Sequence, residues 1–129
     1  MKRILLIEDD KYLCLLLERI LRKTYHVTVT HDAVEAFCSI TEENRPDLIV
    51  TDIRMPHLDG LEFIENMKDA GILKEVPVII LSGYSHDDYR SRCLALGAEA
   101  FLSKPFEPKI LTEIIKNVLD SRKANLYEE

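Results

Sequence analysis

Residues 48–52 read Leu-Ile-Val-Thr-Asp, a short run of strand-forming residues that ends on a carboxylate. An apolar run without alternation is typical of a strand buried on both faces, because a strand with one wet face alternates apolar and polar residues. Ile4–Ile7 and Val78–Leu81 repeat the pattern and are also followed directly by polar residues. These three segments predict the centre of a parallel sheet that is covered by helices on both sides.

Amphipathic segments separate the apolar runs. Residues 11–23 carry leucines at helical spacing, and either Asp9 or Asp10 can cap that helix. Asp32 is expected to cap a second helix carrying Val34, Phe37 and Ile40. The rest of the chain predicts strands over 26–30 and 100–103, helices over about 61–71 and 85–96, and a last helix that carries apolar residues from Ile110 to Leu119. The alternation of five strands with five helices predicts an α/β fold with a mostly parallel sheet.

The composition restricts the class of protein. The chain has 129 residues, 47% of them apolar, and a net charge of -6; these values fit one soluble domain and argue against non-specific binding of nucleic acid. We expect residues 1–121 to form the domain and residues 122–129 to form a polar C-terminal tail or the start of a linker. The N-terminal apolar run is too short for a signal peptide or a membrane span, so a cytoplasmic location is expected.

The cysteines give no sign of a metal centre. Cys14, Cys38 and Cys93 are widely spaced and form no C-x-x-C pair. Cys14 and Cys38 stand among apolar residues, so we expect buried thiols and a reducing compartment.

The ends of the predicted strands carry the chemistry. Ligands of open α/β sheets bind outside the carboxyl ends of the strands, where this sequence places Glu8, Asp9, Asp52, Ser82 and Lys104. Three carboxylates in one place repel one another, and a bound Mg²⁺ together with the lysine would balance their charge. Mg²⁺ prefers such hard oxygen ligands and keeps several waters. The pattern therefore predicts a weak, exchangeable Mg²⁺ site with room for a phosphoryl oxygen.

Four motifs in this order resemble the receiver domains of bacterial two-component response regulators. They are Ile-Leu-Leu-Ile-Glu-Asp-Asp over 4–10, Asp-Ile-Arg-Met-Pro-His-Leu-Asp-Gly over 52–60, Leu-Ser-Gly over 81–83 and Ser-Lys-Pro-Phe over 103–106. The resemblance covers residues 2–121. It implies a doubly wound, flavodoxin-like parallel sheet with strand order 2-1-3-4-5 and five helices on both faces.

The resemblance also implies a role for each site residue. Asp52 is the expected acceptor of a phosphoryl group from the phosphohistidine of a sensor histidine kinase or phosphotransfer protein. Mg²⁺ would be held by Asp9, Asp52 and the backbone carbonyl of Arg54, with Glu8 acting through a water. Lys104 would pair with the phosphate, and its peptide bond to the following proline is expected to be cis.

Ser82 and Phe101 resemble the family's switch pair. Ser82 would move to hydrogen-bond a phosphate oxygen, and Phe101 would rotate inward into the space released. The family often has Thr and Tyr at these positions, so the phenolic hydroxyl is missing here. The expected output face is the fourth helix, the fifth strand and the fifth helix, residues 84–121, where an effector domain, a partner protein or a second copy after phosphorylation would bind. No direct contact with nucleic acid or membrane is expected.

Other interpretations remain open from the residues alone. The acids at 8–10 can be helix caps, Asp52 a loop acid, and Ser82-Gly83 and Lys104-Pro105 ordinary turns. An aspartate-based phosphatase would need a second acid two residues after Asp52, where Arg54 stands. A flavin-binding protein of the same fold would need a phosphate-cradling loop after the first strand, where the acids stand. We therefore expect self-catalysed phosphoryl transfer to Asp52 and its hydrolysis, with no turnover of an external substrate.

Some residues have no firm assignment. The four histidines are scattered and are interpreted as surface or loop residues, although His57 is close to the predicted acid pocket. By resemblance, Arg54 and Tyr84 flank the pocket and can influence the lifetime of the phosphorylated state. The chain is either a free-standing receiver or part of a longer regulator.

Overall fold

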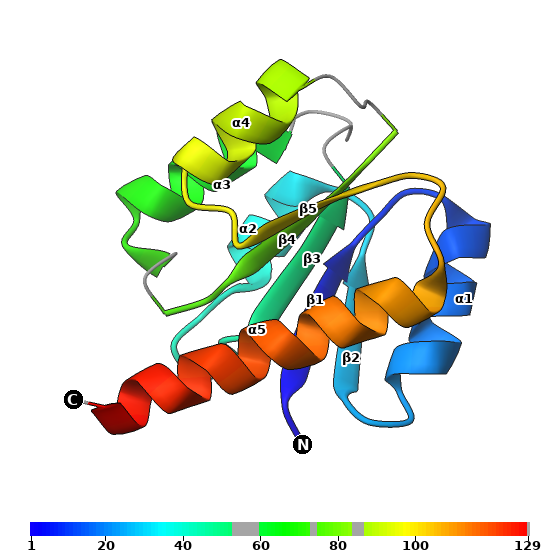
Figure 1. Cartoon of the computed structure of the whole chain (residues 1–129), viewed down its shortest axis with the longest axis horizontal. Helices are drawn as coiled ribbons and strands as arrows, with labels where there is room; N and C mark the ends of the chain where they lie inside the picture. The colour runs from blue at the N-terminus through cyan, green and yellow to red at the C-terminus, as the bar shows by residue number, and fades with distance from the viewer. Residues whose placement is uncertain (53–59, 73–74, 84–86, 129) are drawn as a thin grey trace.

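Five strands alternate with five helices along the chain (Figure 1). The computed structural model describes residues 1–52, 60–72, 75–83 and 87–128. In chain order the elements are β1 (Arg3–Ile7), α1 (Lys11–Leu21), β2 (His26–Thr30), α2 (Ala33–Ser39), β3 (Leu48–Asp52), α3 (Gly60–Asp69), β4 (Val78–Ser82), α4 (Asp87–Ala95), β5 (Ala100–Ser103) and α5 (Pro108–Glu128).

The strands form one parallel sheet in the order β2-β1-β3-β4-β5. This order confirms the doubly wound prediction. Because every strand runs the same way, the carboxyl ends of all five meet at one edge of the sheet. In the register, Ile7 lies opposite Thr51 on one side and Thr30 on the other. The residues that follow β1 and β2, and the end of β3, therefore come together at that edge.

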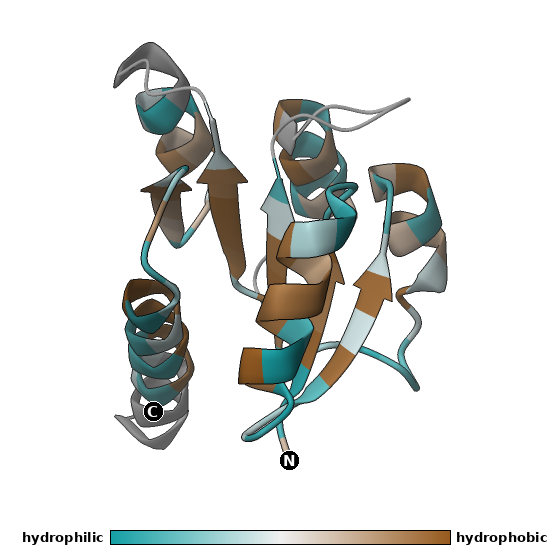
Figure 2. Cartoon of the chain, turned by 90° about the vertical axis from the view of Figure 1, so that its right-hand side faces the viewer, coloured by the Kyte–Doolittle hydropathy of each residue, from teal (hydrophilic) through white to brown (hydrophobic). Residues whose placement is uncertain are grey.

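Helices cover both faces of the sheet, and each face has its own hydrophobic core. On one face α1 and α5 pack over Ile4, Leu6 and Val50; on the other α2, α3 and α4 pack over Leu5, Ile7 and Ile49. Strands β3 and β4 are buried along their whole length, which explains their unbroken apolar sequences. Figure 2 shows the central strands as the most hydrophobic part of the molecule. A fully buried aliphatic side chain contributes roughly 1.5–3 kcal/mol.

Helix ends follow the predicted capping residues. The Asp10 carboxylate accepts hydrogen bonds from the backbone N–H groups of Tyr12 and Leu13, and Asp32 caps α2 in the same way through Glu35. Of the two candidates for the first cap, Asp10 is the residue used. Gly97, shortly after the end of α4, has a φ of 115°, a left-handed conformation that side chains disfavour.

Helix α2 differs from the prediction in which residues face the core. Ala33 and Ala36 are fully buried, while Val34 is 47% exposed and Cys38 is exposed as well. Val34 and Cys38 are four residues apart and lie on one helix face, which points away from the sheet. The expectation that Cys38 is a buried thiol is therefore wrong, whereas Cys14 is buried.

Helix α5 runs through the segment that was expected to be a polar tail. It ends at Glu128, so residues 122–128 continue the helix. The end of the helix thus does not mark the domain boundary that we placed at residue 121. None of the helices in the described part of the chain is both long and apolar enough to cross a bilayer.

Candidate functional site

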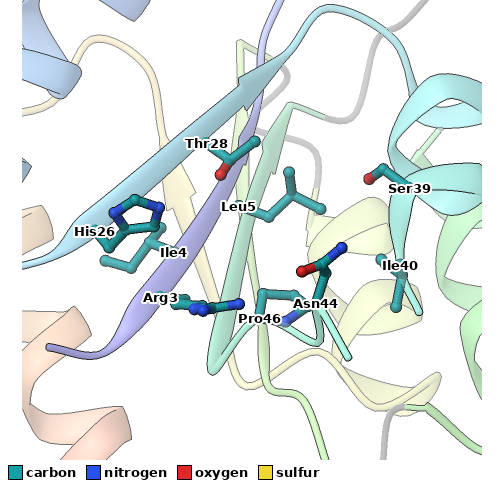
Figure 3. Close-up of a pocket in the computed structure, with 9 residues that line it drawn as sticks. All are labelled: Arg3, Ile4, Leu5, His26, Thr28, Ser39, Ile40, Asn44 and Pro46. Atoms are coloured by element: carbon teal, nitrogen blue, oxygen red, sulfur yellow. The ribbon is translucent and has the colours of Figure 1, made fainter. Parts of the chain in front are cut away.

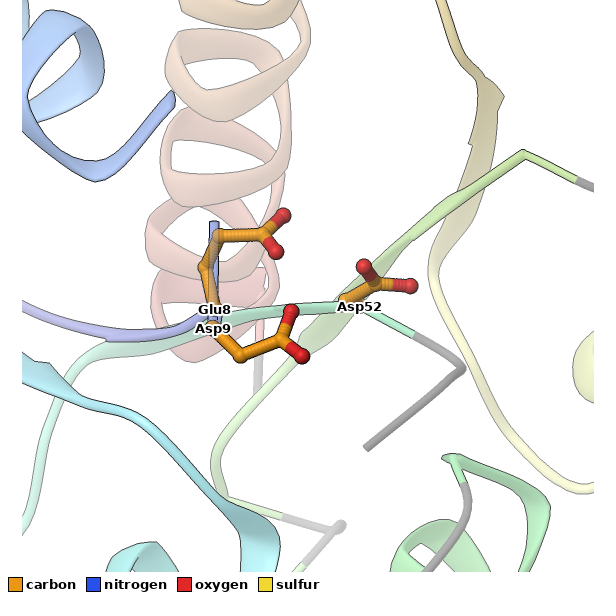
Figure 4. Close-up of side chains that lie close together, drawn as sticks. All are labelled: Glu8, Asp9 and Asp52. Carbon is orange, nitrogen blue, oxygen red and sulfur yellow. The ribbon is translucent and has the colours of Figure 1, made fainter. Parts of the chain in front are cut away.

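Three carboxylates meet at the carboxyl edge of the sheet. Glu8 and Asp9 directly follow β1, and Asp52 is the last residue of the neighbouring strand β3. One carboxylate oxygen from each residue lies within 4.8 Å of the others. Figure 4 shows the side chains of Glu8 and Asp9 extending toward Asp52. The structure therefore brings two adjacent acids together with a third that lies more than 40 positions later in the sequence, as the strand order predicted.

Lys104 joins this group from the edge strand β5, two strands away from β3 in the sheet. It follows β5, and its backbone N–H donates to the carbonyl oxygen of Ser82 across 2.6 Å. The ammonium group donates to Glu8 Oε1 at 2.7 Å and to Asp52 Oδ2 at 2.8 Å. The peptide bond between Lys104 and Pro105 is cis, as expected. One lysine thus bridges the acids from two different strands.

Burial makes the charges of this group costly. Glu8 is fully buried and Asp52 is 7% exposed, whereas Asp9 is exposed. Burial raises the pKa of Glu8 above its usual value, and the charge of Asp52 adds to this, although Lys104 and the N–H of Asp10 oppose it. Burial alone would lower the pKa of Lys104, but its hydrogen bonds to Asp52 and Glu8 outweigh that effect and raise it. The lysine is therefore held in its charged form.

The donor set fits Mg²⁺. The three carboxylates carry three negative charges and Lys104 carries one positive charge. A divalent cation would balance the two negative charges that remain. Carboxylate oxygens are the ligands that Mg²⁺ prefers. Glu8 is the least available of the three because Oε1 bonds the lysine and Oε2 accepts from the N–H of Asp10 at 3.2 Å. Asp9 and Asp52 are the better placed direct ligands.

The switch candidates lie on β4 and β5, the two strands beyond β3 in the sheet. Ser82 is the last residue of β4, next to β3 in the sheet, and it is fully buried. Phe101 lies on β5 and is 6% exposed, packed in the core beneath α2, α3 and α4. The sequence analysis expected Phe101 to turn inward only when Ser82 moves. In this structure the residue is buried, and its rotation on phosphorylation stays a prediction.

Several sequence-based assignments lie outside the described residues. These are the backbone carbonyl of Arg54, the loop residue His57 and the flanking residue Tyr84. The expected output face is described from residue 87 onward, through α4, β5 and α5.

The sequence analysis missed two residues that contact the acid pocket. The backbone carbonyl of Glu8 lies 3.2 Å from Cys14 Sγ and 3.0 Å from His31 Nδ1. Burial and the surrounding acids, Glu8 first among them, raise the pKa of Cys14 to about 11, so the thiol keeps its proton near neutral pH. The strand register explains the contact of His31: this residue follows Thr30, which lies opposite Ile7, the residue before Glu8. In parallel strands, the residues that follow such a pair are neighbours.

A separate hollow of about 330 Å³ opens at the other end of the sheet (Figure 3). Its lining includes Arg3 and His26, the first residues of β1 and β2, together with Leu5 and Pro46. None of the described residues that line the hollow is acidic, and the hollow lies at the amino ends of the strands. It therefore does not belong to the acid group at the carboxyl edge.

Comparison with known proteins decides the family. A family model described as the response regulator receiver domain matches residues 4–116. The chain belongs to this family. The match confirms the resemblance that the four motifs carried. Proteins of this family interact with histidine kinases and effector domains in two-component systems, and they bind Mg²⁺ at an acidic pocket.

Individual relatives agree with the family match. Transcriptional regulatory protein PrrA of Mycobacterium tuberculosis is 40% identical over 117 residues, which are 90% of this chain and 48% of that protein. A CheY-like receiver domain protein from Methanospirillum hungatei has a TM-score of 0.87 at 30% identity, covering 97% of this chain and 98% of the other. The receiver domain of a histidine kinase from Syntrophus aciditrophicus has a TM-score of 0.82 at 32% identity, covering 94% and 92%. This chain spans about half or less of the length of the curated relatives it matches.

Proposed function

We propose that this receiver domain is a phosphorylation-dependent switch that accepts a phosphoryl group on Asp52. The donor is the phosphohistidine of a sensor histidine kinase or of a phosphotransfer protein. The observation that carries the proposal is the group formed by Glu8, Asp9, Asp52 and Lys104, in which carboxylates and an ammonium converge at the carboxyl edge of the sheet.

Asp52 is the nucleophile in this proposal. Its carboxylate attacks phosphorus, a P–O bond forms, and the P–N bond to the donor histidine breaks with its electron pair leaving on the imidazole. Asp52 is suited to this role because it remains 7% exposed while Glu8 is sealed in. Such transfer needs mainly positioning and charge stabilisation. The ammonium of Lys104, 2.8 Å from Asp52 Oδ2, is close enough to pair with an oxygen of the transferred group.

Asp9 and Asp52 would hold Mg²⁺ directly, together with the backbone carbonyl of Arg54. Glu8 would act through a water, because both of its carboxylate oxygens already accept hydrogen bonds. When bound, Mg²⁺ would neutralise the carboxylates and the negative charge on the phosphoryl oxygens. Asp9 supports this arrangement because it is exposed and is not one of the two acids that Lys104 bridges.

Ser82 and Phe101 would convert phosphorylation into a change of surface. The hydroxyl of Ser82 would donate a hydrogen bond to a phosphate oxygen and draw the end of β4 toward Asp52. Phe101 is buried, and we propose that its ring rotates into the space that Ser82 releases. The altered surface would be α4, β5 and α5, within residues 84–121.

That surface would bind an effector domain, a partner protein or a second copy of the chain. Residues 1–121 would act as the receiver domain, and residues 122–129 as a C-terminal tail or the start of a linker. The domain would make no direct contact with nucleic acid or membrane and would work in the cytoplasm. Its only catalysis would be phosphoryl transfer to its own Asp52 and hydrolysis of the product.

The experiment is phosphorylation by acetyl phosphate, followed by intact mass. We expect one added phosphoryl group, about 80 Da, in the presence of Mg²⁺ and none in EDTA. Asp52→Asn should remain folded and gain no mass, whereas Asp47→Asn, which changes an acid at the opposite end of β3, should react like the wild type. An equal adduct on Asp52→Asn would contradict the proposal.

A further inference from the structure

The backbone carbonyl of Glu8 receives two side-chain contacts from different parts of the chain. Cys14 Sγ reaches it from the first turns of α1 at 3.2 Å, and His31 Nδ1 reaches it from the residue after β2 at 3.0 Å. A carbonyl oxygen can only accept, so the thiol donates its hydrogen and Nδ1 of the imidazole must carry one. The N–H of Glu8 donates to the carbonyl of Thr30 at 3.1 Å.

This carbonyl is at the centre of the acid group. It belongs to the peptide unit that joins Glu8 to Asp9, so the two carboxylates project from its two ends. Glu8 has no exposed surface, and a buried carbonyl that loses its donors must either stay unsatisfied or rotate toward a new partner. Rotation of this peptide unit would move the Asp9 carboxylate relative to Asp52.

Cys14 is buried for a reason other than core packing. It is 4% exposed, yet among the buried apolar residues of the described chain it alone belongs to neither of the two core clusters. Its sulfur is instead directed at the peptide after β1. His31 is an exposed residue whose ring nitrogen still meets the same buried oxygen.

We propose that Cys14 and His31 are positioning residues for the Mg²⁺ site, fixing the Glu8–Asp9 peptide so that both carboxylates face Asp52. The inference rests on the proposed function, because it assumes that these carboxylates serve a cation. Cys14 on α1 and His31 after β2 would thus affect the affinity for the metal, although neither residue supplies a ligand. Residues that orient metal ligands commonly change affinity about 10- to 100-fold when they are replaced.

The test is the Mg²⁺ dissociation constant of the full chain, measured by isothermal titration calorimetry. His31→Ala and Cys14→Ala should each weaken binding by about 3-fold, and the double variant by roughly 10-fold, at the low end of that range because the contact acts through the backbone. His31→Asn and Cys14→Ser keep a donor at nearly the same place and should restore affinity to within about twofold. Cys38→Ala and His26→Ala remove exposed residues of the same types and should change nothing.

Melting temperatures separate positioning from a purely structural role. Cys14→Ala removes a buried atom and is expected to lower the melting temperature, but His31→Ala changes an exposed residue and should leave it nearly unchanged while still weakening Mg²⁺ binding. Unchanged Mg²⁺ affinity in folded His31→Ala and in the double variant would overturn the inference. If the wild type took up a phosphoryl group but the variants bound Mg²⁺ equally well, only the inference would fail. If the wild type bound no Mg²⁺ and accepted no phosphoryl group, the proposed function would fail with it.

Discussion

Lys104→Met should destabilise the metal-free protein strongly, and the loss should depend on pH. The ammonium of Lys104 lies 2.7 Å from Glu8 and 2.8 Å from Asp52, and its side chain is only 22% exposed. Without it, two buried carboxylates face each other with oxygens within 4.8 Å. At an effective dielectric constant of about 20, two unit charges at that distance repel by about 3.5 kcal/mol.

Partial exposure of the lysine reduces this repulsion. We therefore expect the free energy of unfolding to fall by about 3 kcal/mol at pH 7, which is at the low end for breaking a buried ion pair. Burial and the charge of Asp52 raise the pKa of Glu8 in the folded protein, and loss of the lysine would raise it further. The penalty is therefore complete above the folded pKa values and disappears as the pH falls below the unfolded ones, near pH 4. In the wild type the raised pKa of Lys104 keeps its ammonium group charged at pH 7.

Urea unfolding in EDTA, followed by circular dichroism because the chain has no tryptophan, measures this difference. Lys104→Arg keeps the charge and should lose less stability, and Lys109→Met, an exposed lysine on α5, should lose almost none. A Lys104→Met protein as stable as the wild type at pH 7, or a deficit of equal size at pH 7 and pH 4.5, would refute the electrostatic account.

Three further predictions concern single side chains. Glu8→Gln should raise the stability of the metal-free protein at pH 7 by on the order of 1 kcal/mol, because the raised pKa of Glu8 means that folding disfavours its ionised form. This gain should vanish below about pH 4.5, where the Glu8 of the unfolded chain is protonated as well. Urea unfolding that shows a less stable variant at pH 7 would contradict the prediction. Ser82→Ala should slow phosphorylation by acetyl phosphate about 10-fold through loss of one charge-assisted hydrogen bond, while Ser82→Thr should keep the wild-type rate. Intact mass followed over time measures both rates, and equal rates for Ser82→Ala and the wild type would show that the hydroxyl takes no part in the transfer. Asp10→Ala should cost about 1 kcal/mol by removing the cap on two N–H groups, and Asp10→Ser less than half of that; thermal unfolding that shows no loss would show that the cap contributes nothing.

Much of the fold was predictable because local and global signals agree. The unbroken apolar runs at β1, β3 and β4 become the most buried strands, and the capping aspartates lie where α1 and α2 begin. Parallel topology then places the ends of β1 and β3 together. For this reason the sequence alone predicts that Glu8, Asp9 and Asp52 share one site.

The errors come from properties that are set by tertiary packing. On α2, Phe37 and Ile40 pack against the core, but Val34 is left 47% exposed while Ala33 and Ala36 are fully buried. The contacts of Cys14 and His31 with the Glu8 carbonyl require the register of β1 with β2, which composition and periodicity do not provide.

The most direct test of the central claim is chemical identification of the phosphorylated residue. The protein is treated with acetyl phosphate and Mg²⁺, the acyl phosphate is reduced with borohydride to homoserine, and the peptides are sequenced by mass spectrometry. We predict homoserine at position 52, formed only when Mg²⁺ is present. Homoserine at Asp9 or at another acid, or none at position 52 in folded protein that binds Mg²⁺, would contradict the account.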